Sequence, residues 1–264
     1  MNGRVVLLTP MNASEETTDS ADRSRLAKSP VFGTTLWTIV LAAGDPNNPD
    51  AAVALDRLCR TYWYPVYAYV RRKGRAGADA EDLTQEFFSR LLARDFPVGV
   101  ERDGGKFRSY LLRALDHFLI NEWNRGNAVK RGGGSITFSL DGVDADARYA
   151  LEPIDGSTPE SLYDRRWAVA VLETVRAGLR QEYVGQGKSK MFEALEPCLT
   201  GGDDLLPYAE LMMRLDLKES ALKMAVHRLR KRFGELLREE IEKTVATPDE
   251  VEGEIRQLIT AAST

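Results

Sequence analysis

The stretch LPYAELMMRLDLKESALKMAVHRLRKRFGELL, residues 206–237, decides the fold of the C-terminal half of the chain. Apolar residues recur in it at steps of three and four, first from Tyr208 to Leu215 and again from Leu222 to Phe233. This spacing places them along one face of a helix, and residues 216–218 interrupt the stripe. The pattern predicts two helices joined by a three- or four-residue turn, as in a helix-turn-helix.

The second of these helices carries a local excess of positive charge. Six cations stand against a single acid, Glu219, although the formal net charge of the 264-residue chain is −4. A cationic helix face can be an ordinary solvated surface, or it can bind the phosphates of DNA. The six cations are Lys218, Lys223, Arg228, Arg230, Lys231 and Arg232.

The composition is that of a globular protein. Hydrophobic residues make up 43% and charged residues 29% of the chain, enough for one large domain or two small ones. Cys59 and Cys198 are the only cysteines, too few for a disulfide framework or a cysteine-rich metal site. No apolar run reaches the roughly 18 residues that would span a bilayer, and the start of the chain lacks the features of a signal peptide. We expect a cytoplasmic protein without membrane insertion.

Two further helices are predicted in the N-terminal half. The segment DAEDLTQEFFSRLL, residues 79–92, sets an acidic strip of Asp79, Asp82 and Glu86 beside an apolar face. The segment KFRSYLLRALDHFLINEWNR, residues 106–125, begins a run up to position 131 that holds six cations against two acids, together with several aromatic rings. Exposed rings among cations suit single-stranded nucleic acid, because the rings stack on unpaired bases. The same rings could equally belong to the core.

The fold class follows from these patterns: an all-α protein of two small helical bundles joined by a flexible acidic linker, the second bundle containing the helix-turn-helix. Gly132-Gly133-Gly134 marks the boundary before the linker, Thr158-Pro159-Glu160 restarts a helix, and Thr247-Pro248-Asp249-Glu250 begins a further one. The predicted parts are a disordered arm at 1–30, a first domain at 31–131, a linker at 132–157, a second domain at 158–243 and a C-terminal helical extension at 244–264.

Recognisable catalytic chemistry is missing from the sequence. The glycine run 132–134 lacks the Lys-Ser/Thr pair of a phosphate-binding loop. His117 and His227, the only histidines, have no carboxylate or cysteine at ligand spacing. We therefore expect a binding protein, not an enzyme, that needs no metal and no cofactor.

Three segments, in this order, resemble a bacterial RNA polymerase sigma factor of the sigma-70 family, extracytoplasmic-function (ECF) type, in a larger variant with a C-terminal extension. Residues 79–92 resemble its polymerase-binding helix, residues 106–125 its promoter-melting and −10-reading helix, and residues 208–233 its −35-reading helix-turn-helix. The first domain would be sigma region 2-like and the second region 4-like. The resemblance implies a factor that binds core RNA polymerase and directs promoter recognition, melting and transcription initiation.

The resemblance also implies partners and candidate residues. The clamp coiled coil of the largest polymerase subunit would contact Asp79, Asp82, Gln85, Glu86, Phe88 and Arg90. Single-stranded promoter DNA at the −10 element would contact Arg108, Arg113, Asn121, Trp123 and Arg125. The −35 duplex would contact Lys218, Glu219, Ser220, Lys223, Met224, His227, Arg228, Arg230 and Lys231, with Arg232 as a further phosphate contact. An anti-sigma factor or another regulator could also bind, and auto-inhibition, core packing and regulator binding all stay open for residues 244–264.

Two other functions stay open at this point. A stand-alone helix-turn-helix transcriptional regulator would bind duplex DNA alone and would not need the acidic strip of residues 79–92. An enzyme acting on nucleic acid through Asp79, Asp82 and Glu86 would depend on a divalent cation. Binding to core polymerase separates the first of these from a sigma factor.

Overall fold

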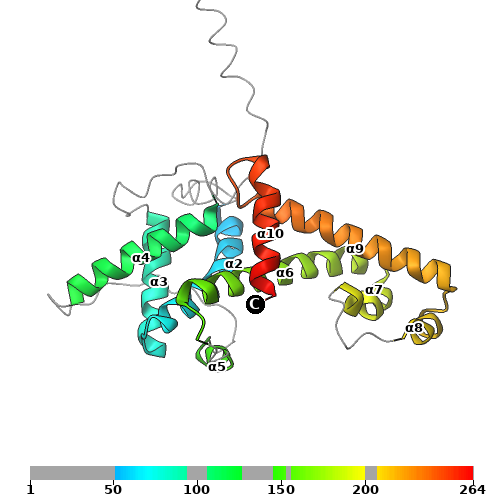
Figure 1. Ribbon diagram of the computed structural model, residues 1–264, viewed down its shortest axis with the longest axis horizontal. Helices are drawn as coiled ribbons and strands as arrows, with labels where there is room; N and C mark the ends of the chain where they lie inside the picture. The colour runs from blue at the N-terminus through cyan, green and yellow to red at the C-terminus, as the bar shows by residue number, and fades with distance from the viewer. Residues whose placement is uncertain (1–50, 94–105, 127–144, 153–155, 200–206, 264) are drawn as a thin grey trace, which may run out of the picture. The chain divides into compact units, whose positions relative to one another are not determined.

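The structure, a computed structural model, describes residues 51–93, 106–126, 145–152, 156–199 and 207–263 (Figure 1). These ranges contain helices and no strand, which confirms the all-α fold class. The arm predicted at 1–30 lies outside them. The α-helices are α2 (Ala51–Arg72), α3 (Gly77–Ala93), α4 (Phe107–Gly126), α5 (Ala145–Ala150), α6 (Pro159–Gly185), α7 (Ser189–Leu195), α8 (Tyr208–Leu215), α9 (Glu219–Glu242) and α10 (Val251–Ala262), and two short 3-10 helices are η1 (Glu196–Leu199) and η2 (Pro248–Glu250).

Helix α2 is the centre of the larger hydrophobic core. It packs against α3 and α6, and its aromatic face is almost wholly buried. The ring of Tyr62 meets the ring of Phe107 at the start of α4 edge-on, with the centroids 5.3 Å apart. Phe87 of α3 and Phe118 of α4 close the other side, 5.7 Å apart. Each ring taken fully out of water stabilises the fold by about 1.5–3 kcal/mol, so these helices hold a firm scaffold for surface side chains.

The C-terminal half of the chain contributes to the same core. The first half of α6 buries Trp167, whose indole N–H donates to the Tyr62 hydroxyl at 3.2 Å. Ile241 near the end of α9 and Leu258 of α10 are also part of it. Helix α10 crosses α6 and the end of α9 (Figure 1). Long helix α6 therefore links the helices of the first predicted domain to those of the second, and the domain boundaries themselves stay a prediction.

A smaller core lies under helices α7, α8 and α9. Leu179 from the second half of α6 and Phe192 of α7 are fully buried there, together with Leu211 of α8 and Leu222 of α9. Three residues, 216–218, connect α8 to α9, which is the turn length that the sequence predicts. Asp216 takes a left-handed conformation with φ of 50° and ends α8. Aspartate tolerates this region better than most residues, so the turn needs no glycine.

One element was not predicted. The linker range 132–157 contains the short helix α5 and the residues after it, where the sequence analysis expected a flexible tether. The Tyr64 hydroxyl donates to the Glu152 carboxylate at 2.7 Å, and the Tyr67 hydroxyl donates to Asp146 at 3.1 Å. These acids gain partners on α2 that local sequence cannot reveal.

Two predicted helix starts are confirmed. The side chain of Thr158 accepts a hydrogen bond from the Ser161 amide at 3.1 Å, and Pro159 is the first residue of α6. Before α10, the Glu250 carboxylate accepts from the Thr247 amide at 3.2 Å in a capping box. Such caps satisfy amides that the first turn of a helix leaves without partners.

Candidate nucleic-acid interface

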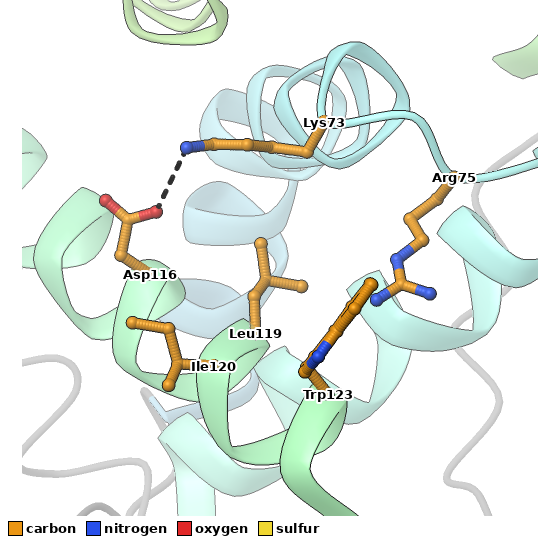
Figure 2. Close-up of a pocket in the computed structure, with 6 residues that line it drawn as sticks. All are labelled: Lys73, Arg75, Asp116, Leu119, Ile120 and Trp123. Carbon is orange, nitrogen blue, oxygen red and sulfur yellow. Dashed lines mark ion pairs between the residues drawn. The ribbon is translucent and has the colours of Figure 1, made fainter. Parts of the chain in front are cut away.

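A pocket of about 330 Å³ opens between the end of α2 and the C-terminal half of α4 (Figure 2). Two cations and one acid line it, together with an apolar wall from α4. Figure 2 shows Leu119 pointing into the space between the charged side chains at one end and the indole ring at the other. A site of this size and composition can admit a planar, polar-edged ring. The lining residues are Lys73, Arg75, Asp116, Leu119, Ile120 and Trp123.

Trp123 forms the outer wall of the pocket. Its side chain is 62% exposed, and Ile120, one turn earlier, is 59% exposed. The guanidinium of Arg75 covers one face of the indole ring. Two large apolar side chains are therefore open to solvent beside each other at the pocket.

The opposite end of the pocket is polar. The Lys73 Nζ atom lies 3.7 Å from Asp116 Oδ1 and 3.4 Å from the Glu160 carboxylate. The hydroxyl of Tyr69 donates to Asp116 at 2.6 Å. Burial, assisted by the two carboxylates, raises the pKa of Tyr69 above its usual range. The Tyr69 hydroxyl therefore stays protonated, and its hydrogen bond holds the Asp116 carboxylate at the pocket.

The other residues predicted to contact single-stranded DNA divide into two groups. Arg113 and Asn121 are exposed on α4, as a contact with DNA requires. Arg125 belongs to α4, but its side chain lies outside the described part of the chain. Arg108 is a different case, because it does not reach the surface.

The prediction for Arg108 needs correction. Its side chain is buried, and its Nε atom donates to the Glu254 carboxylate of α10 at 3.0 Å. The guanidinium also pairs with Asp164 of α6 and lies over the Trp167 ring, with 4.8 Å between Cζ and the ring centroid. Helical periodicity placed Arg108 on the polar side of α4, but acids far along the chain cover that position. In this conformation Arg108 does not contact DNA.

The acidic strip of α3 is partly as predicted. Asp79 and Asp82 are exposed, and Gln85 is partly exposed beside them. The Glu86 carboxylate accepts from Arg90 at 2.7 Å, and Arg90 also pairs with Glu122 of α4 at 3.0 Å.

Phe88 is the second correction. It was predicted to contact a partner, but it is fully buried and packs edge-on against Phe87, with ring centroids 5.5 Å apart. Phe88 follows Phe87 directly in the helix, and both positions fall within the wide apolar face of α3. Phe88 therefore belongs to the core of the protein.

A second, cationic pocket of about 410 Å³ lies between α8 and α9. Near the start of α9, Lys223 pairs with Glu219 at 2.6 Å, and both are well exposed. Their hydrogen bond lowers the pKa of Glu219 and raises that of Lys223, so both stay charged at neutral pH. Lys218, Ser220 and Met224 are exposed on the same turns. The pocket is lined by Tyr208, Lys223, Val226, His227, Arg230 and Lys231.

The cations of α9 do not form a single surface, because some of them bind groups of the protein itself. Arg228, Arg230 and Lys231 are exposed, and Arg230 also donates from Nε to the Cys198 carbonyl at 2.9 Å. Arg232 binds Glu182 of α6 at 2.7 Å and also pairs with Glu235 and Glu239. Three carboxylates thus bind Arg232, and its ion pair with Glu182 connects α9 to α6. The phosphate contact predicted for Arg232 stays a prediction, and a phosphate there would compete with these three carboxylates.

Several pocket residues were missed by sequence analysis. Lys73, Arg75 and Asp116 were not among the residues predicted to contact DNA. Asp116 lies more than 40 positions from either cation in the chain. No local pattern brings them together, because only the packing of α4 near the end of α2 does so.

Within the described ranges, no group of three or more His, Cys, Asp or Glu side chains is placed to hold a metal ion. None of the helices described there is long and apolar enough to cross a membrane.

Residues 58–128 match the family Sigma-70 region 2. The matched stretch covers most of α2 and all of α3 and α4, and it therefore includes the acidic strip and the whole lining of the Arg75–Trp123 pocket. No curated protein and no solved structure matches the chain. The match supports a sigma factor of the sigma-70 family, a class of protein that binds RNA polymerase and recognises promoters.

Proposed function

We propose that the chain is a sigma factor of the ECF type that binds core RNA polymerase and directs promoter recognition, melting and transcription initiation. The observation that supports this proposal most strongly is the position of two surfaces in the chain. The region 2 match at 58–128 contains both the exposed acidic strip of α3 and the cationic, aromatic pocket of α4. Polymerase binding and strand capture would each have a surface within one small group of helices.

The pocket supplies a physical means of promoter melting. An unstacked base of the non-template strand would stack near Trp123, while Lys73 and Arg75 attract the backbone phosphates. Melting then needs no catalytic group, because the binding energy of the captured bases offsets the lost pairing and stacking. Arg113 and Asn121 extend the same contact along exposed α4.

Helix α3 would bind the clamp coiled coil of the largest polymerase subunit. Asp79, Asp82 and Gln85 are available to a cationic partner, and Glu86 stands beside them in its pair with Arg90. Complementary charge speeds the encounter of two proteins and fixes their register.

Helices α8 and α9 would read the −35 element as a helix-turn-helix. The first turns of α9 would enter the major groove, where Ser220, Lys223 and Met224 are exposed toward base edges. Lys223 must exchange its bond to Glu219 for one to DNA. Arg228, Arg230 and Lys231, with His227 beside them, would bind phosphates and add affinity without sequence information.

Binding to core polymerase tests this proposal. Asp82→Lys reverses an exposed charge in the strip and leaves the Glu86–Arg90 pair in place, so it should weaken capture by core polymerase. Glu173→Lys makes an equal charge change at an exposed position of α6. It is the matched control and should bind core polymerase as the unmodified chain does. A chain that binds duplex DNA but never core polymerase would be a stand-alone regulator, and the proposal would be wrong.

A further inference from the structure

The C-terminal helix α10 lies against the start of α4 through a set of charged contacts. Glu254 is fully buried, and its carboxylate pairs with Lys106 Nζ at 2.8 Å and with Arg108 Nε at 3.0 Å. The side-chain oxygen of Gln257, one turn further on, accepts from both cations. The backbone amide of Phe107 donates to the Thr244 carbonyl at 2.8 Å. Three groups of the C-terminal segment, the Thr244 carbonyl, Glu254 and Gln257, thus face the successive residues 106–108 at the start of α4.

The charges in this contact balance. Lys106 and Arg108 carry two positive charges, and Glu254 and Asp164 carry two negative ones. Without α10, only Asp164 would stay beside the two cations. The start of α4 would then carry a net positive charge and would be open to solvent on the side that Glu254 now covers.

Glu254 offers Arg108 and Lys106 what a phosphate group offers. Its two oxygens accept from two different cations, in the way that adjacent oxygens of a phosphate bind an arginine and a lysine. Lys106 and Arg108 lie inside the stretch that matches region 2, whereas α10 lies well outside it. A side chain from the extension therefore occupies a position where nucleic acid could bind the matched part.

Helix α10 also packs on α6 and on the end of α9, and it contributes to the larger core. It is a helix of 12 residues near the C-terminus, joined to α9 by the segment 243–250. Its buried apolar side chains are Val251 and Leu258. Access of DNA to Lys106 and Arg108 therefore requires α10 to move away from α6 and α9.

We propose that α10 masks a nucleic-acid-binding site at the start of α4, and that DNA competes with Glu254 for Lys106 and Arg108. This inference rests on the proposed function to the extent that α4 binds single-stranded DNA. It makes the extension an intramolecular competitor that lowers the affinity of the free chain for DNA.

Anisotropy titration of a fluorescein-labelled single-stranded oligothymidylate tests the proposal. Glu254→Gln removes the competing charge, so the full-length variant should bind at least about fivefold more tightly than the unmodified chain, the low end of usual coupling between sites. The dependence of affinity on salt should also become steeper by about 0.7 in log–log slope for each phosphate gained. Adding Arg108→Gln to this variant should remove most of the gain.

The matched control is Glu252→Gln. Glu252 lies on the same helix and pairs with Arg238 of α9, so its loss changes the net charge equally without touching α4. Equal binding by Glu254→Gln and Glu252→Gln would overturn the proposal, and so would the absence of oligonucleotide binding by Glu254→Gln.

A variant that strengthens the mask covers the case in which Glu254→Gln does not fold. Gln257→Glu adds an acid beside Lys106 and Arg108 and should lower affinity by about fivefold or more. Thr260→Glu on the same helix is its control, and equal affinities would contradict the mask.

Core-polymerase binding separates this proposal from the proposed function. A chain that binds core polymerase but shows no change on Glu254→Gln would be a sigma factor without a mask. A chain that gains oligonucleotide affinity on Glu254→Gln but never binds core polymerase would have the mask without being a sigma factor.

Discussion

The guanidinium of Arg75 lies over the indole ring of Trp123, with 5.3 Å between its Cζ atom and the ring centroid (Figure 2). Arg75 comes from the turn between α2 and α3, and Trp123 from the end of α4. The cation holds one face of the ring, so the largely exposed indole has a fixed orientation. A ring held in this way loses little further freedom when a base stacks on it.

Trp123→Ala should therefore weaken binding of single-stranded promoter DNA by roughly 5- to 150-fold, since one base–aromatic stack contributes about 1–3 kcal/mol. The free energy of unfolding should change little, because the side chain is 62% exposed. Leu151→Ala, at another exposed apolar position, is the control and should leave DNA binding unchanged. Equal affinities of the two variants would remove Trp123 from the interface.

Phe88→Ala should destabilise the protein by about 3–5 kcal/mol, because it leaves a cavity beside Phe87 in the larger core. Urea titration followed by circular dichroism measures this loss. Asp82→Lys on the same helix should leave stability nearly unchanged, since its side chain is exposed. A Phe88→Ala variant of normal stability would contradict the burial of this ring.

Two lysines of α9 should affect −35 binding differently. Lys223→Ala should alter the preference among duplex sequences, because Lys223 lies near the start of the proposed recognition helix. Lys231→Ala should weaken binding to all sequences alike and reduce the log–log salt slope by about 0.9, as expected for one phosphate contact. Selection from a randomised duplex, together with titrations at several salt concentrations, separates the two effects. Identical sequence preferences in both variants would refute this division.

Stability should fall in alkaline solution because of the tyrosines of α2. Burial raises the pKa of Tyr62 above its ordinary value of 10.0, and burial together with the Asp146 contact raises that of Tyr67 to about 12. Unfolded tyrosines lose their protons near pH 10, before the folded ones do. The stabilisation is therefore complete below pH 10 and is lost as the pH rises toward the folded pKa values.

Urea titrations on both sides of pH 10 measure this loss. Tyr62→Phe removes one of the shifted hydroxyls and should make the decline shallower. A free energy of unfolding that falls equally steeply in the variant would assign the alkaline loss to other groups.

Helix type, order and several helix ends were predictable from local pattern. The Thr158-Pro159 start of α6 and the capping box at Thr247 are short-range signals, and both are confirmed. The turn of residues 216–218 was also read from an interruption of apolar spacing. Such features depend on neighbours in the sequence, which is why a single sequence reveals them.

The features that sequence reasoning missed depend on distant partners. Helix α5 and the residues after it are held by hydroxyls of α2 that lie 79 and 88 positions away. Arg108 and Arg232 were assigned to DNA because they are cations on polar helix faces, yet acids of other helices bind both. Charge near a helix surface does not distinguish a contact with a partner from a contact between helices. The prediction that Phe88 contacts a partner was wrong for a related reason, since a wide apolar face buries more positions than a strict stripe.

Run-off transcription with core RNA polymerase tests directly whether the chain is a sigma factor. A promoter for the factor would first be selected from genomic fragments transcribed by core polymerase with the full-length chain, and its start site would then be mapped. Transcripts from a defined start are expected only when the chain is present, and Asp82→Lys and Trp123→Ala should each reduce their yield. Transcription that is unchanged by adding the chain, across all fragments, would contradict the assignment as a sigma factor.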